Sequence, residues 1–239
     1  MKKIFMTLAA VAVAATMNAQ LYVGGGLGFT SQNDKTERPI AVTPTTTGTR
    51  TVEITTTSIE FLPEVGYKLN DKMAVGAEFG ISFAKKEYPE YAAVNAWGMG
   101  TLAKGEKFEL SGTEIAFKPY FRYFLVNWDK VSLFVDGQVG ITSGKYTGDY
   151  TDVNGATQSR DIKTTGFSIA VKPGIAFQAS KKISLVAKLG NGFGYFQDKT
   201  TTPVANPVGP GTVDMDETTS KFGLNLNSLG LQFGAYYNF

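Results

Sequence analysis

The sequence contains no cysteine and no histidine among its 239 residues. Without cysteine the protein forms no disulfide and has no thiol chemistry. Without histidine it lacks the usual base of serine and cysteine hydrolases and the usual nitrogen ligand of zinc. After the first 20 residues, no segment contains the roughly 20 consecutive apolar residues that a membrane helix needs. These absences exclude disulfide scaffolds, the common triad hydrolases and helical membrane proteins.

The longest apolar run lies at the start of the chain, in MKKIFMTLAAVAVAATMNAQ. Lys2 and Lys3 precede it, and small residues lead to Ala19, a pattern typical of a secretory signal peptide. A membrane anchor is the alternative, but the apolar run is shorter than roughly 20 residues. We therefore expect residues 1–19 to be a signal peptide and residues 20–239 to form one mature domain.

The mature chain also lacks an excess of either sign of charge. Loss of Lys2 and Lys3 with the signal peptide leaves 21 basic residues against 21 acidic ones. Binding of nucleic acid needs a clustered excess of lysine and arginine, so no nucleic-acid partner is expected. No motif for a cofactor or a metal is present, and the glycine-rich segments 24–28 and 190–194 lack the spacing of a dinucleotide-binding loop.

What the sequence does contain is alternation of apolar and polar residues, with 13% aromatic residues and 27 glycines, which favours an all-β fold. The pattern predicts eight strands, near residues 20–30, 57–69, 73–83, 108–126, 131–141, 167–178, 183–193 and 221–239. Short turns at 70–72, 127–130 and 180–182 alternate with long polar segments at 31–56, 84–107, 143–164 and 197–220. An eight-stranded antiparallel up-and-down β-barrel, with turns at one end and four loops at the other, accounts for this order.

Two kinds of barrel share this periodicity. A soluble lipocalin-like barrel turns its apolar face inward, whereas a transmembrane barrel turns it toward lipid. The sequence favours the transmembrane barrel because each apolar face is long enough for the membrane and aromatic residues gather near the strand ends. The polar faces would then form a structural network of paired charges inside the barrel, from Glu60, Glu64, Glu78, Glu114, Lys118, Arg122, Asp136, Lys172 and Lys188.

The chain ends in the strand-like segment LQFGAYYNF. Its Gln232, Gly234, Tyr237 and Phe239 resemble the terminal assembly signal of small outer-membrane β-barrels of the OmpA/OmpX and porin-like type. The resemblance implies an outer-membrane location, contact with lipid, and recognition of this segment by the barrel-assembly machinery and periplasmic chaperones. It also implies that the last strand pairs with the first. We further expect the barrel to be a monomer.

The expected function is non-enzymatic: a structural protein of the Gram-negative cell envelope, or a surface-interaction protein that uses its four extracellular loops. A narrow pore for ions or small solutes is the alternative, since a charged wall can also conduct. A soluble periplasmic ligand-binding barrel is a third possibility. Asp214, Asp216 and Glu217 lie in one of the expected loops, but they lack the full ligand pattern of a calcium site.

Overall fold

The computed structural model describes residues 21–43, 46–88, 93–94, 100–101, 108–151, 157–190, 192–205, 212–224 and 230–239. The expected signal peptide at residues 1–19 lies outside them. The strands in this part of the chain are β1 (Leu21–Thr43), β2 (Thr46–Asn70), β3 (Met73–Tyr88), β4 (Ala93–Val94), β5 (Gly100–Thr101), β6 (Phe108–Asn127), β7 (Val131–Thr151), β8 (Thr157–Gln178), β9 (Ile183–Leu189), β10 (Phe193–Ala205), β11 (Thr212–Leu224) and β12 (Leu231–Asn238). None of the described residues forms a helix long and apolar enough to cross a membrane.

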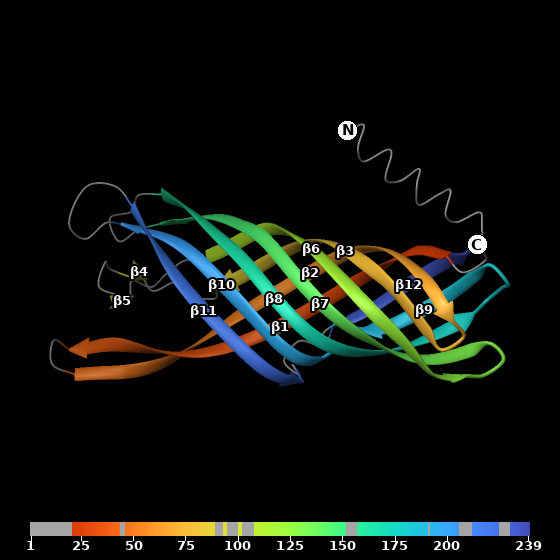
Figure 1. Cartoon of the computed structure of the whole chain (residues 1–239). Helices are drawn as coiled ribbons and strands as arrows, with labels where there is room; N and C mark the ends of the chain where they lie inside the picture. The colour runs from red at the N-terminus through yellow and green to blue at the C-terminus, as the bar shows by residue number, and fades with distance from the viewer. Residues whose placement is uncertain are drawn as a thin grey trace, which may run out of the picture.

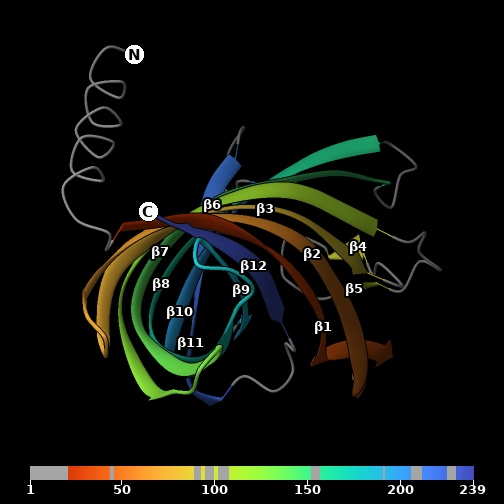
Figure 2. The same ribbon diagram turned by 90° about the vertical axis from the view of Figure 1, so that its right-hand side faces the viewer.

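Eight of these strands form a closed antiparallel ring in the order β1, β2, β3, β6, β7, β8, β9, β12. Pairing of β12 with β1 closes the ring, from Tyr22 opposite Asn238 to Phe29 opposite Leu231. Figures 1 and 2 show the elongated barrel and its curved wall. The predicted eight-stranded antiparallel barrel is therefore confirmed, as is the pairing of the last strand with the first.

The two ends of the barrel differ as the sequence predicts. The three short turns lie at one end, which we call the turn end, together with the C-terminus (Figure 1). Local hydrogen bonds hold these turns, such as the one that the Lys72 amide donates to Asn70 Oδ1 at 2.8 Å. The opposite end, which we call the hairpin end, carries the segments that the sequence predicts to be long loops.

Three of the four segments expected to be loops are mostly strand. Residues 31–43 and 46–56 continue β1 and β2, residues 143–151 and 157–164 continue β7 and β8, and residues 197–205 and 212–220 continue β10 and β11. The fourth segment, 84–107, contains the end of β3 and the short strands β4 and β5, and its other residues lie outside the described part. The prediction of four loops was wrong here because threonine-rich polar segments also form β-hairpins, which need no apolar face.

The last two predicted strands are interrupted. The segment expected at 183–193 divides into β9 and β10, and the segment expected at 221–239 divides into β11 and β12. At the break the backbones approach closely, since the Gly190 amide donates a hydrogen bond of 2.7 Å to the Gly230 carbonyl. Beyond this point β10 pairs with β8 and β11, so the β10–β11 hairpin extends the sheet outside the ring.

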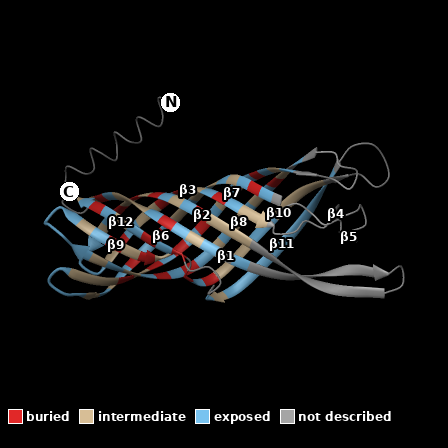
Figure 3. Cartoon of the chain, turned by 180° about the vertical axis from the view of Figure 1, so that it is seen from behind, coloured by how far each residue is buried: buried red, intermediate tan, exposed pale blue. Residues whose placement is uncertain are grey.

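Alternate residues of the ring face opposite ways, and the outer face is apolar. The outward side chains of Leu27, Ile115 and Phe233 are 61%, 61% and 60% exposed, whereas the inward Glu78 and Asp136 are 0% and 1% exposed. Figure 3 shows this alternation as bands of buried and exposed residues along the strands. An apolar outer face around a charged interior is the arrangement of a transmembrane barrel, and it is the reverse of a lipocalin-like barrel.

Exposed aromatic residues occur near both borders of the apolar band. They are Tyr67, Tyr123, Trp128, Tyr237 and Phe239 toward the turn end, and Phe29, Phe83 and Phe193 toward the hairpin end. Girdles of aromatic residues at both membrane interfaces are expected of a transmembrane barrel. Two further aromatic residues lie near the hairpin-end border in the sequence. Of these, Tyr195 is half-buried, and the side chain of Phe108 lies outside the described residues.

Candidate functional site: the charged interior

The register of the strands sets the charged residues side by side on the inner wall. Glu64 of β2 lies opposite Glu78 of β3, which in turn lies opposite Lys118 of β6. Arg122 of β6 lies opposite Asp136 of β7. Because the short turns fix the register, charges far apart in the sequence meet at one depth in the barrel.

Arg122 is the most constrained of these residues. Its guanidinium donates two hydrogen bonds to Asp136, with Nε 2.6 Å from Oδ1 and an Nη 2.8 Å from Oδ2. The same Nη donates to Glu64 Oε1 at 3.1 Å, and the guanidinium carbon lies 4.0 Å from the centroid of the Phe134 ring. Arg122 is 2% exposed, so its two-pronged pairing and ring contact form away from bulk water.

Glu64 accepts hydrogen bonds from four side chains. Tyr120 and Arg122 donate to Oε1 at 2.5 Å and 3.1 Å, and Tyr236 and Lys188 donate to Oε2 at 2.7 Å and 2.8 Å. A carboxylate has about four acceptor sites, so the acceptor capacity of Glu64 is filled. Such a carboxylate holds strands together, since its donors come from β6, β9 and β12.

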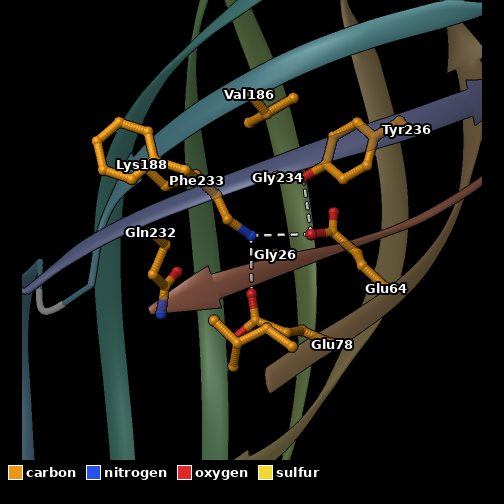
Figure 4. A pocket seen from close by; sticks show the side chains of 10 residues that line it. Gly26, Glu64, Glu78, Val186, Lys188, Gln232, Phe233, Gly234 and Tyr236 are labelled. Atoms are coloured by element: carbon orange, nitrogen blue, oxygen red, sulfur yellow. Dashed lines mark hydrogen bonds and ion pairs between the residues drawn. The ribbon is translucent and has the colours of Figure 1, made fainter. Parts of the chain in front are cut away.

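Lys188 links two carboxylates, as Figure 4 shows. Its ammonium donates to Glu64 Oε2 at 2.8 Å and to Glu78 Oε2 at 2.7 Å. Lys118 completes the arrangement from the other side, with its nitrogen 3.6 Å from Glu78 Oε1. We call Glu64, Glu78, Lys118, Arg122, Asp136 and Lys188 the central cluster; its three acids and three bases balance in formal charge.

Three residues of the predicted network stand apart from these pairs. Lys172 is 5% exposed and lies opposite Asp136, but it forms no ion pair with the described residues. Glu60 is reached by Gln232 Nε2 at 3.5 Å, and Glu114 is half-buried with no ion pair in the described part of the chain. The structure thus brings six of the nine predicted residues into one paired cluster.

Little free space remains beside the central cluster. A cavity of about 10 Å³ lies against Glu64, Glu78, Lys188 and Gln232 (Figure 4). That volume is near the minimum of roughly 10–15 Å³ for one water molecule. The Oε1 atom of Gln232, buried at its edge, has no hydrogen-bond partner among the described residues. At this depth the interior is filled by side chains.

Sequence reasoning missed the aromatic residues that surround the cluster. Tyr22, Tyr120, Phe134 and Tyr236 all point inward and are at most 6% exposed. Tyr22 and Tyr120 share a hydrogen bond of 2.6 Å between their hydroxyl groups, which connects β1 to the Tyr120–Glu64 bond. Their inward orientation could have been predicted from the alternation, because each of these rings lies on the polar face of its strand.

A second signal lies in the neighbouring strands, where each of these inward rings faces a glycine. The cross-strand pairs are Tyr22 with Gly66, Tyr120 with Gly76, Phe134 with Gly174 and Tyr236 with Gly24. A Cβ atom added at any of the four glycines would overlap the facing ring. The absent side chain therefore provides the space that the ring occupies.

The expected assembly signal divides between the two faces of β12. Gln232 points inward and is 3% exposed, whereas Tyr237 and Phe239 are exposed on the outer face with ring centroids 5.0 Å apart. Gly234 lies opposite Gly26 of β1. The Phe239 amide donates a hydrogen bond of 3.1 Å to the Leu21 carbonyl, which fixes the chain end at the seam. Recognition of this segment by assembly factors stays a prediction.

The acidic residues near the end of the chain lie in β11 and form no metal site. Asp214, Asp216 and Glu217 are exposed, and Asp216 forms an ion pair of 2.7 Å with Lys199. Hydrogen bonds from Lys199 and Thr201 hold the pKa of Asp216 below its ordinary value. No group of three or more acidic side chains in the described residues is arranged to hold a metal ion.

No protein-family model matches the sequence, and a search of the curated proteins found no significant match. Among solved structures, the chain is similar to the outer membrane protease OmpT from Escherichia coli, with 12% identity, a TM-score of 0.49, and 92% of this chain and 97% of that one covered. Neisserial surface protein A has 13% identity and a TM-score of 0.36, with 92% and 97% covered. The attachment invasion locus protein Ail of Yersinia pestis has 11% identity and a TM-score of 0.39, with 92% and 99% covered. At this level of similarity, no residue role is assigned to this chain from those proteins.

The chain has the fold of a transmembrane β-barrel. Eight of its strands close into a ring, and its outer face is apolar with aromatic borders. A soluble periplasmic barrel with an inward apolar face does not agree with this arrangement.

Proposed function

We propose that the protein is a non-enzymatic barrel of the cell envelope whose interior is sealed and whose role is structural or lies in surface interaction. The observation that supports this proposal most directly is the central cluster, in which Arg122, Glu64 and Lys188 connect strands from opposite parts of the sequence. Buried ion pairs that are also hydrogen-bonded hold a barrel in one arrangement and obstruct its lumen.

Two features support the absence of catalysis. The chain has no histidine, and the interior carboxylate with the most partners, Glu64, accepts four hydrogen bonds. A general base needs a free lone pair directed at its substrate, which Glu64 does not offer. The protease activity in the name of OmpT belongs to that protein, and the low similarity gives no reason to assign it to this one.

The OmpA/OmpX or porin-like affinity remains part of the proposal and rests on the terminal segment with Gly234, Tyr237 and Phe239. So do the signal peptide at residues 1–19, the monomeric state, and assembly through periplasmic chaperones and the barrel-assembly machinery. In this proposal outer-membrane lipid surrounds the barrel, and a surface ligand would bind at the hairpin end.

The alternative is a narrow pore, which is favoured by the half-buried Glu60 and Glu114 and by Lys172, which forms no ion pair with the described residues. Planar-bilayer recordings on the refolded protein distinguish the two functions. A sealed barrel inserts without steady current, whereas a pore gives reproducible conductance steps. The double variant Arg122→Gly with Lys188→Gly is the positive control, because it removes the two side chains that connect the cluster. Steady conductance of the unmodified barrel would reject the proposed function.

The surface role is tested by shortening one hairpin without disturbing the ring. Thr202 pairs with Met215, and Thr201 donates a hydrogen bond of 2.6 Å to Asp216. Replacement of residues 202–215 by an Asn-Gly turn therefore keeps the last bonded pair. We expect the shortened barrel to fold normally but to lose surface binding or to weaken the envelope in cells. Unchanged binding and envelope integrity after equivalent shortening of all the long hairpins would contradict a surface role.

A further inference from the structure

Within the described part of the chain, strand β11 forms a free edge of the sheet. It pairs with β10 along Thr212–Leu224, and no other described strand pairs with it. Toward the hairpin end, β1 pairs with β12 only as far as Phe29, so above that level β12 does not connect β1 to the rest of the sheet. The sheet thus continues from β8 through β10 to β11 and ends there (Figure 1).

The outer part of this edge lies beyond the apolar band. Asp216 pairs with Thr201, which pairs with Lys163 of β8, and Lys163 pairs with Lys145 of β7. Lys145 and Lys163 are exposed on neighbouring strands, and charged side chains on the lipid face are destabilising. The barrel at the height of these two lysines therefore lies outside the hydrocarbon of the membrane. The last apolar outward residue of β11 toward the hairpin end within the band is Phe222. A partner can therefore reach residues 212–219 from water.

Of the usual protections against strand addition, the described part of this edge has only charged side chains. Strand β11 has 13 residues, contains no proline, and pairs with β10 without a bulge. Residues 213–222 are exposed on both faces of the strand. Natural edge strands are mostly short, bulged, charged, interrupted by proline or covered, because their free amides and carbonyls pair with other chains. Such groups bind extended peptides by strand addition.

Charge indicates which peptide fits. Asp216 is neutralised by Lys199 on β10, but Asp214 and Glu217 form no ion pair in the described part of the chain. They are three positions apart, so their side chains lie on opposite faces of β11. An added strand would place residues three positions apart directly opposite them, and basic residues there would form cross-strand charge pairs. A second copy of this strand would instead bring a further set of carboxylates to the edge.

We propose that the free edge of β11 binds an extended segment of another polypeptide with two basic residues three positions apart. This inference rests on the proposed surface-interaction role and names its site and the class of partner. The side chains of the bound segment would alternate between the two faces of the extended sheet, and its backbone would pair with the amides and carbonyls on the free edge of β11.

The test uses the refolded full barrel in a neutral detergent and a labelled synthetic peptide, Thr-Lys-Val-Thr-Lys-Val-Thr. Fluorescence anisotropy measures binding, and hydrogen exchange followed by NMR measures protection of the β11 amides. We expect saturable binding and protection of alternate amides in β11. The same peptide with glutamate in place of lysine should not bind.

Variants of the barrel supply the matched controls. Asp214→Asn with Glu217→Gln should lower the affinity about fivefold, since two cross-strand charge pairs are lost. Asp149→Asn, which removes an exposed acid of β7 at the same end of the barrel, should leave the affinity unchanged.

Four results would overturn the inference: no saturable binding, equal affinity for the glutamate peptide, slow exchange of β11 amides in the free monomer, or protection that depends on protein concentration. Slow exchange in the monomer would mean that the chain covers its own edge, and concentration dependence would mean that a second copy does. Failure of the inference is distinguishable from failure of the proposed function. If the peptide does not bind but the shortened hairpin still abolishes surface binding in cells, the surface role holds and the edge is not its site.

Discussion

Replacement of Arg122 by alanine should lower the free energy of unfolding by about 4 kcal/mol, because removal of one partner from a buried ion pair costs roughly 3–5 kcal/mol. The change leaves the buried carboxylate of Asp136 without its two donors, and it also removes one donor from Glu64. Contact of the guanidinium with Phe134 at 4.0 Å is lost as well. The loss should therefore lie well above that of an ordinary surface substitution.

Urea titration of the barrel in lipid vesicles measures this effect, with the fraction of fast-migrating folded protein on unboiled gels as the signal. Lys145→Ala is the matched control, since it removes an ion pair of 2.7 Å with Asp161 whose partners are about half exposed. Exposed pairs contribute roughly 0–1 kcal/mol, so this variant should unfold near the urea concentration of the unmodified barrel. An equal, small loss for both variants would refute the role assigned to the central cluster.

A double variant separates the charge from the packing. Arg122→Met with Asp136→Leu removes both ions of the pair and replaces them with apolar side chains. Because such replacement of a whole pair is often neutral, it should recover at least about 2 kcal/mol of the loss. If the single variant does not fold, Arg122→Lys keeps the positive charge without the two-pronged geometry and should show an intermediate stability.

Two further substitutions test the packing of the interior and the chain end. Gly174→Ala should lower the urea midpoint, because its Cβ would overlap the ring of Phe134, whereas Gly137→Ala should not, because its Cβ would meet one backbone oxygen at 3.8 Å. Phe239→Ser should reduce the yield of folded barrel in cells far more than Phe29→Ser, although both residues are about half exposed at the outer face. Equal yields of these two variants would count against a terminal assembly signal, since both lose similar apolar contact with lipid.

The sequence predicted which residues face lipid, because a period of two fixes both faces of a strand once one residue is assigned. Phe79 and Glu78 show the result, since Phe79 is 47% exposed and Glu78 is fully buried. Alternation did not show how far the strands continue beyond the membrane, because polar side chains interrupt the apolar face in the outer part of a threonine-rich hairpin such as that of β10 and β11. Nor did it show the break at Gly190, which depends on contact with Gly230 far along the chain.

Pairing in the charged interior depends on register, which single strands do not contain. Arg122 and Asp136 are 14 residues apart, and the turn between β6 and β7 places them opposite each other. Lys172 lies opposite the same Asp136, but the guanidinium occupies both carboxylate oxygens. Composition therefore predicts a balanced interior but not which base remains outside the pairs.

The pairing of inward rings with glycines connects these two levels. An aromatic residue on the polar face of one strand requires a glycine at the facing position of the next, as Tyr120 requires Gly76 and Phe134 requires Gly174. A shift of one residue between β3 and β6 would place the Tyr120 ring against a side chain and would also move Lys118 away from Glu78. Steric fit and charge pairing therefore specify the same register. For this reason the interior side chains select one strand alignment as well as fill the barrel. The apolar outer face tolerates many different apolar residues and provides the contact with lipid.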